Sequence, residues 1–184
     1  MSATASAALT RSQIAAWDTT HLEDAAMRWR QLAAESEELF ARHRQNISSP
    51  GGTDWVGDAR DAALDRVTTD ANVVRKQGDI QREAADIAEN GCRDIRAAQF
   101  QTLEAINVAE EAGFRVAEDL SVTDRRRMDV YTMATRYTAA REFAEDIRWH
   151  AERLVQADAY IAQRLQAKAA ELSGVRFGGD TIQA

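Results

Sequence analysis

A single break separates two long segments that favour helix in the first part of this chain. Residues 46–57 contain the only proline of the sequence, Pro50, followed directly by Gly51 and Gly52. Proline and glycine interrupt helices because one lacks the amide hydrogen and the other adopts many backbone conformations. The alanine-rich, charged segments on both sides have no comparable interruption. The sequence therefore predicts two long helices joined by a turn.

The composition agrees with a folded, helical protein. Apolar residues make up 45% of the 184 residues and charged residues 29%, a balance that excludes a disordered polar chain. The length fits one ordinary domain. An all-β protein needs turn residues about every 8 to 12 positions, whereas the nine glycines here are mostly clustered. We therefore expect an all-α fold.

The first helix is expected from about residue 11 to residue 45, after a disordered stretch over residues 1–9. Thr10 and Gln13 have the spacing of a capping box, in which each side chain bonds the backbone of the other. Side chains at steps of three and four residues predict one buried face. They are Ile14, Trp17, His21, Ala25, Trp29, Leu32, Leu39, His43 and Ile47.

The second helix is expected to run from the turn to about residue 112. Its apolar stripe slips in phase near Gly78 and Gly91, so either the helix bends there or the small residues let a neighbouring helix approach closely. Gly113 is expected to stop it by taking the left-handed conformation. Residues 10–112 then form a helical hairpin.

Residues 113–173 are expected to contain a connection and a third helix that packs on the hairpin. Ser121 and Asp124 have the spacing of a second capping box, which predicts the start of that helix, and Ser173 and Gly174 end it. Residues 174–184 are expected to be a flexible tail or linker. The fold predicted from these elements is an elongated antiparallel bundle of three long helices.

The charge of the chain disfavours two classes of partner. Lysine and arginine total 23 against 30 acidic residues, a net charge of -7, so no global field attracts nucleic acid or anionic lipid. The arginine run at residues 125–127 is expected to be a solvated helix turn.

No apolar run reaches about 18 residues, so no transmembrane segment is expected. The first ten residues lack the pattern of a signal peptide, and export would need a leaderless route.

The sequence has no pattern typical of an enzyme site. His21, His43 and His150 fall on the faces expected to be buried, and none belongs to a metal-binding motif. The single cysteine, Cys92, lies among apolar neighbours and is expected to be buried and inert. We therefore expect no catalytic residues, no metal and no cofactor. An enzyme that uses His21 or His150 is the least favoured of three functional hypotheses.

Trp55, Val56 and Gly57 close the break and precede the second long helix. This arrangement resembles the WXG100 (ESAT-6-like) family, whose members are helical-hairpin substrates of the type VII (ESX) secretion systems of actinobacteria. The resemblance covers about residues 10–112. The additional third helix is similar to that of longer substrates, such as PPE and EspB-like proteins, or to a toxin's N-terminal targeting domain.

The resemblance implies a non-enzymatic protein, or an N-terminal export domain, recognised as a folded helical bundle. The family's export signal pairs the Trp-x-Gly turn with a Tyr-x-x-x-Asp/Glu motif after the second helix. Here Phe114 and Glu118 have that spacing, with phenylalanine in place of tyrosine. The expected recognition residues are therefore Trp55, Gly57, Phe114 and Glu118.

The partners implied are a type VII secretion ATPase or chaperone, and either a small WXG100 partner or a second copy of the chain. The protein is expected in the cytoplasm before export and then outside the cell or at the cell envelope. The alternative hypothesis is a cytosolic helical scaffold or oligomerisation module that has no export role.

Overall fold

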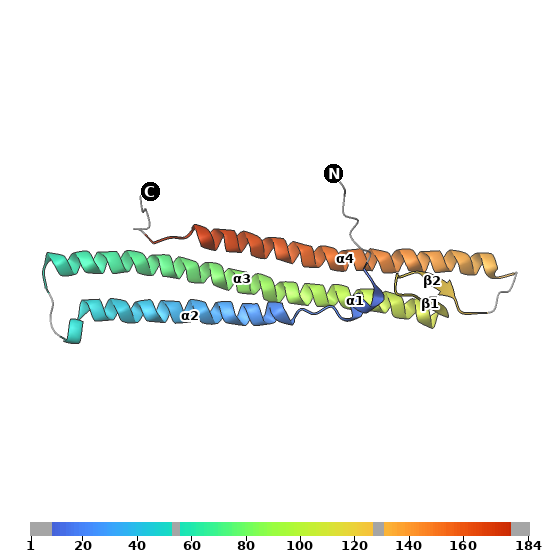
Figure 1. The fold of residues 1–184 in the computed structure, drawn as a ribbon, viewed down its shortest axis with the longest axis horizontal. Coiled ribbons are helices and arrows are strands. Elements are labelled where there is room, and N and C mark those ends of the chain that lie inside the picture. Colours follow the sequence, from blue (N-terminus) through green and yellow to red (C-terminus); the bar gives the residue numbers. More distant parts are fainter. Residues whose placement is uncertain (1–8, 53–55, 127–130, 178–184) are drawn as a thin grey trace. The chain divides into compact units, whose positions relative to one another are not determined.

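The computed structural model describes residues 9–52, 56–126 and 131–177 and is mostly helical. Figure 1 shows the order of the elements along the chain. They are α1 (Arg11–Ala15), α2 (Thr20–Ser48), the 3-10 turn η1 (Pro50–Gly52), α3 (Asp58–Glu111), β1 (Phe114–Val116), β2 (Val122–Asp124) and α4 (Met133–Gly174). The expectation of a helical protein is confirmed, with a small two-stranded sheet added to it.

The chain forms two compact units. The first contains Met1–Thr20 and Gly91–Tyr160, and the second contains His21–Asn90 and Ile161–Ala184. Helices α3 and α4 are each divided between the two units, α3 after Asn90 and α4 after Tyr160.

Ion pairs show that α2 and α3 run antiparallel in the second unit. Arg30 on α2 bonds Glu89 and Asp86 on α3, and Glu37, farther along α2, bonds Arg82 at 2.6 Å. As the residue numbers rise along α2, the residue numbers of the bonded partners on α3 fall. These pairs are about one third or more exposed, and exposed pairs contribute little free energy. They report the alignment of the helices more than they stabilise it.

The core of the second unit is rich in alanine, which lets helix backbones approach closely. Its buried apolar residues are Leu22, Ala26, Ala33, Val67, Val74, Ile80, Ala84, Ala85, Ile87, Ala88 and Ile161. Helix α3 is continuous through Gly78, where an added Cβ would lie 2.6 Å from Oε1 of Glu37. The side chain of Glu37 on α2 thus occupies the space beside this glycine.

The end of α4 is tied to the second unit. Gln77 on α3 donates from Nε2 to the carbonyl of Val175 at 3.2 Å. The ring of Phe177 stacks on Phe40 of α2, with the ring centroids 6.0 Å apart. Of the expected tail, residues 174–184, Gly174 is the last residue of α4, and residues 175–177 pack against the helices.

The first unit holds the large side chains of the core. Among the described residues, the largest fully buried side chains all belong to it: Phe114, Ile14, Ile95, Ile147, Leu154, Thr102 and Cys92. The expectation that Cys92 is buried is confirmed. Its thiol donates to Oγ1 of Thr19 at 3.2 Å.

A β-hairpin follows α3 in the first unit, where a plain connection was expected. Gly113 has a φ of +87° and ends the helix as predicted. The strands then pair antiparallel, with Val116 opposite Val122 and Phe114 opposite Asp124. The prediction that residues 121–124 cap the third helix is wrong, since they form the turn end and β2, and α4 begins at Met133. The β-branched Val122 and Thr123 suit a strand.

The predicted first helix is also wrong in one respect, because it is broken. Helix α1 ends at Ala15 and α2 begins at Thr20, whose amide donates to Oδ1 of Asp18 at 3.0 Å. The break resets the helical phase, so residues counted from Ile14 no longer share a face. His21 and His43 are exposed, contrary to expectation, and His150 is half-buried.

Candidate recognition site

The α2–α3 turn (residues 49–57) joins two antiparallel helices of the second unit. Helix α2 ends at Ser48, where Ser49 N–H still bonds the carbonyl of Gln45 at 3.1 Å. Proline cannot donate the next backbone bond, and Gly51 takes a φ of +62°. Of the expected recognition residues, Trp55 lies outside the described residues. Its neighbour Val56 is 81% exposed.

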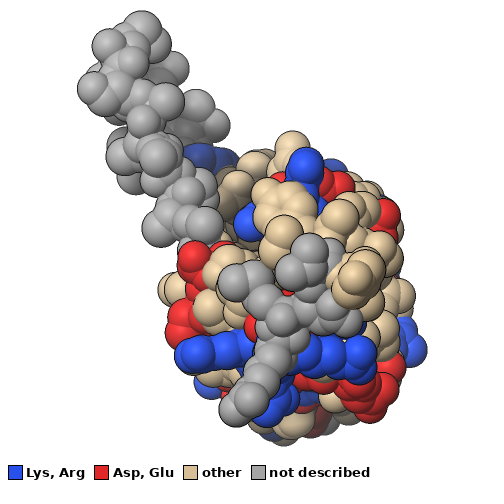
Figure 2. All heavy atoms as spheres, turned by 90° about the vertical axis from the view of Figure 1, so that its right-hand side faces the viewer, with Lys and Arg blue, Asp and Glu red and all other residues tan. Residues whose placement is uncertain are grey.

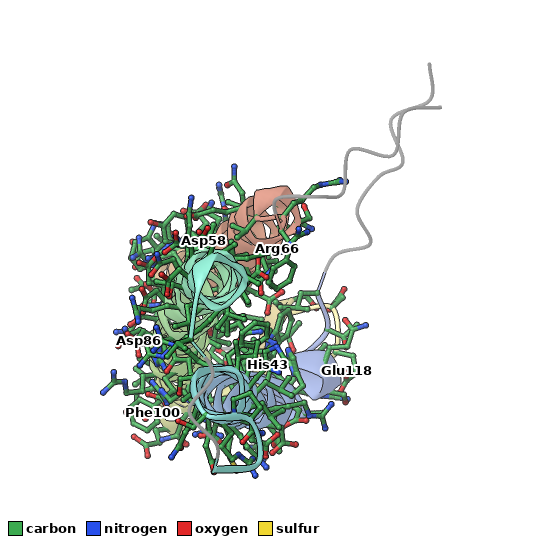
Figure 3. The ribbon with its side chains drawn as sticks, turned by 90° about the vertical axis from the view of Figure 1, so that its left-hand side faces the viewer. His43, Asp58, Arg66, Asp86, Phe100 and Glu118 are labelled. Carbon is green, nitrogen blue, oxygen red and sulfur yellow. The ribbon has the colours of Figure 1, made fainter. Side chains whose placement is uncertain are left out.

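Gly57 caps the N-terminus of α3. Its carbonyl accepts from the amides of Arg60 at 3.0 Å and Asp61 at 3.2 Å. Its φ of +112° is a conformation that side chains disfavour, although an added Cβ would meet no atom of the described residues within 4 Å, its chain neighbours aside. The first turn of α3 carries Asp58 and Asp61, whose charges suit the positive end of the helix dipole. Figure 3 shows this end of α3, with Asp58 labelled.

Phe114 is a core residue of the first unit. It is 1% exposed, and its ring centroid lies 5.2 Å from that of Phe143 on α4. The guanidinium carbon of Arg136 lies over the Phe114 ring, 3.8 Å from its centroid. This distance is typical of a cation–π interaction. The phenylalanine that stands where the family motif has tyrosine thus contributes to packing.

Glu118 caps α1, although its side chain is exposed. Its carboxylate accepts from the amide and the hydroxyl of Ser12, at 3.1 Å and 2.9 Å. Its carbonyl accepts from the amide of Arg11 at 3.0 Å. These bonds satisfy amides that a helix start leaves unpaired. Phe114 and Glu118 lie in the first unit, whereas Gly57 belongs to the second.

Arg136 is the residue that the sequence analysis did not identify. It donates to both carboxylate oxygens of Asp124 at 2.8 Å and 2.7 Å, and to the carbonyl of Ala112 at 3.1 Å. The Arg136 guanidinium holds the pKa of Asp124 well below its usual range, and the Arg126 amide contributes. One side chain thereby joins α4, β2 and the end of α3. No local pattern marks it, because its partners are distant in sequence.

The described residues include no group of three or more His, Cys, Asp or Glu side chains that could hold a metal ion. Within the same ranges, no helix combines the length and the apolar character needed to cross a membrane.

Mycobacterial proteins are similar to this chain. The uncharacterized protein Rv2077c of Mycobacterium tuberculosis is 37% identical over 176 residues, which make up 95% of this chain and 54% of that protein. The uncharacterized protein Mb2102c of Mycobacterium bovis matches to the same extent. The chain spans about half the length of the curated relatives it matches. No family model and no solved structure matches it.

Proposed function

We propose that this protein is a non-enzymatic type VII secretion substrate, or the targeting domain of one, which is exported as a folded antiparallel bundle of three long helices. The observation that carries the proposal is the α2–α3 turn. It connects two antiparallel helices and is capped by Gly57. A tryptophan and this glycine stand at the positions of the Trp-x-Gly signal.

An export signal read on a folded protein must stay accessible after folding. Val56 is 81% exposed, and among the described residues no heavy atom other than those of its chain neighbours lies within 4 Å of the position of a Cβ on Gly57. Packing among the described residues therefore leaves Val56 and Gly57 accessible. A secretion ATPase or chaperone that reads Trp55 and Gly57 could bind without unfolding the helices.

Phe114 and Glu118 take a supporting role in this proposal. The buried ring of Phe114 and the Ser12-bound carboxylate of Glu118 fix the β-hairpin that follows α3. We propose that they shape the surface that the secretion ATPase or chaperone recognises after the second helix. The exposed side chain of Glu118 contacts that partner directly. The mycobacterial source of the relatives agrees with a secretion system of actinobacteria.

Export assays on turn variants test the proposal. Trp55→Ala and Gly57→Arg should leave the far-ultraviolet circular dichroism of the protein unchanged and keep it inside the cell. Gly51→Asn is the matched control, since asparagine tolerates the φ of +62° at this position of the same turn. It should be exported like the wild type. Normal export of both Trp55→Ala and Gly57→Arg would refute the assignment.

Exposed apolar side chains on α4 favour a second candidate, a helical scaffold that stays in the cytoplasm. Tyr137, Trp149 and Tyr160 are each more than half exposed, and exposed apolar surface is typical of protein interfaces. This candidate predicts self-association that is lost when these residues are replaced by serine. Sedimentation measurements on the wild type and the triple variant, with cell fractionation, separate it from the export proposal.

A further inference from the structure

The first unit contains an open groove of about 870 Å³ that is lined by β2 and by the N-terminal part of α4. Val122, Thr123 and Asp124 line it from the strand, and Met133, Tyr137 and Ala140 line it from the helix. Its volume lies within the range of binding pockets in proteins. Figure 2 views the molecule from the side where Figure 1 draws the hairpin and shows basic atoms beside acidic ones on that face.

The edge of β2 opposite β1 has free backbone groups. The flanking bonds of the hairpin run from Arg125 N–H to Gly113 O and from Ala117 N–H to Ser121 O. Bonded and non-bonded pairs alternate in an antiparallel ladder, so the N–H and C=O groups of Val122 and Asp124 point away from β1. Among the described residues, none of these groups has a hydrogen-bond partner.

The groove is basic although the chain is acidic. Four arginines line it, Arg126, Arg136, Arg141 and Arg148, against the two carboxylates of Asp124 and Glu145. The whole chain has a net charge of -7. The guanidinium of Arg136 already donates to the Asp124 carboxylate and to the carbonyl of Ala112 at the end of α3. The only ion pair of Arg141 that the described residues form, with Glu145, is long at 3.7 Å and exposed.

We propose that this groove binds an extended, acidic segment of a partner protein. The segment adds to the free edge of β2 as a third strand, and its carboxylates pair with Arg141 and Arg148. A free strand edge selects an extended peptide because only another strand offers matching donors and acceptors in alternation. The arginines select acidic side chains. Met133 and Ala140 provide apolar surface for the residues between them.

A nucleic acid is the competing occupant that the same arginines could attract. It matches the observations less well, because a phosphodiester backbone accepts hydrogen bonds but cannot donate to the carbonyls of Val122 and Asp124. The proposal goes beyond export and does not depend on it, since all of its residues lie in the first unit.

A defined peptide tests the proposal on the full chain. The probe is a fluorescein-labelled octapeptide of alternating glutamate and valine, and its binding is followed by fluorescence anisotropy at low and high salt. We expect binding that weakens with salt. The double variant Arg141→Glu, Arg148→Glu should weaken it by at least about tenfold. Arg28→Glu, a charge reversal at an exposed position of the second unit, should leave it unchanged.

The strand-addition step has its own readout. Val122→Pro removes an outward amide while the pairing of Thr123 with β1 stays intact, and it should weaken binding at least about fivefold. In the wild type, hydrogen exchange at the amides of Val122 and Asp124 should slow when the peptide is added. A lysine–valine octapeptide and a single-stranded oligonucleotide should not cause this protection.

Three results would overturn the proposal. The acidic peptide could fail to bind, the amides of Val122 and Asp124 could exchange at the same rate with and without it, or the oligonucleotide could bind as tightly as the peptide. The exchange measurement uses the wild-type protein and therefore does not depend on how Val122→Pro folds.

Discussion

Arg136 illustrates how much a single residue contributes to the first unit. Its planar guanidinium bonds the Asp124 carboxylate and the carbonyl of Ala112, and it covers the ring of Phe114. Lysine could replace the charge but not this set of directed bonds. No local sequence pattern marks Arg136, because each of its bonds depends on chain segments that meet only after folding.

The Asp124–Arg136 pair makes stability depend on acid. Since Arg136 holds the pKa of Asp124 below its ordinary value of 3.8, the stabilisation is fully present above about pH 4 and is lost as the pH falls below that. Asp124→Asn should therefore be less stable than the wild type at pH 7, and the difference should shrink toward zero at low pH. Urea unfolding at several pH values measures this difference.

The comparison isolates Asp124 from other acids. The pKa values of Glu110 and Glu37 are also lowered, by hydrogen bonds from Arg11 and Arg82. Their acid dependence is present in both proteins and cancels in the difference. A gap between wild type and Asp124→Asn that stays constant from pH 7 to strong acid would contradict the account.

The burial of Ile147 predicts a large loss of stability when its side chain is shortened. Its side chain is 0% exposed on α4, so Ile147→Ala should lower the free energy of unfolding by about 2 to 5 kcal/mol. Leu39→Ala is the matched control, since Leu39 is 58% exposed on α2, and its effect should stay within about 0.5 kcal/mol. Equal losses in the two variants, measured by chemical denaturation, would show that the described core is misplaced.

At the scale of elements, the sequence predicted what depends on neighbouring residues. The capping box of α1 is confirmed, with Thr10 N–H donating to Oε1 of Gln13 at 2.9 Å and Gln13 N–H donating to Thr10 at 3.2 Å. The second helix was expected to reach about residue 112, and α3 ends at Glu111. Both features follow from local patterns of capping, breaking and apolar spacing.

What the sequence did not predict depends on distant residues. The early end of α1 leaves the carbonyl of Ile14 to accept from the side-chain amide of Gln99 at 2.8 Å, and no proline or glycine marks that break. The β-hairpin was missed because Ser121 and Asp124 satisfy a capping pattern locally. In the candidate site, Gly57 and Phe114 were both predicted as recognition residues, and the core position of Phe114 is evident only from the fold.

The stop of α3 gives a prediction about an element boundary. Gly113 has a φ of +87°, and an added Cβ would lie 3.2 Å from Nε of Arg126. Gly113→Ala should therefore cost about 1 to 2 kcal/mol of unfolding free energy. Gly174→Ala at the end of α4 is the control, because a Cβ there meets nothing within 4 Å. A thermal melt that ranks the two variants in the opposite order would count against the assigned helix end.

At the scale of the molecule, the two units differ in the material of their cores. The first is built on large side chains such as Phe114 and Ile95, and the second is richer in alanine. The export proposal requires that both stay folded while the α2–α3 turn is read. It requires no chemistry from the half-buried His150 or the exposed His21 and His43.

The most direct test of the export proposal is to express the protein in two matched actinobacterial strains. One has an active type VII secretion ATPase, and in the other that ATPase is inactivated in its nucleotide site. We expect the protein in the culture filtrate of the first strain and its retention in the cells of the second, with a cytosolic marker absent from both filtrates. Equal amounts in the two filtrates, or none in either, would contradict the export proposal.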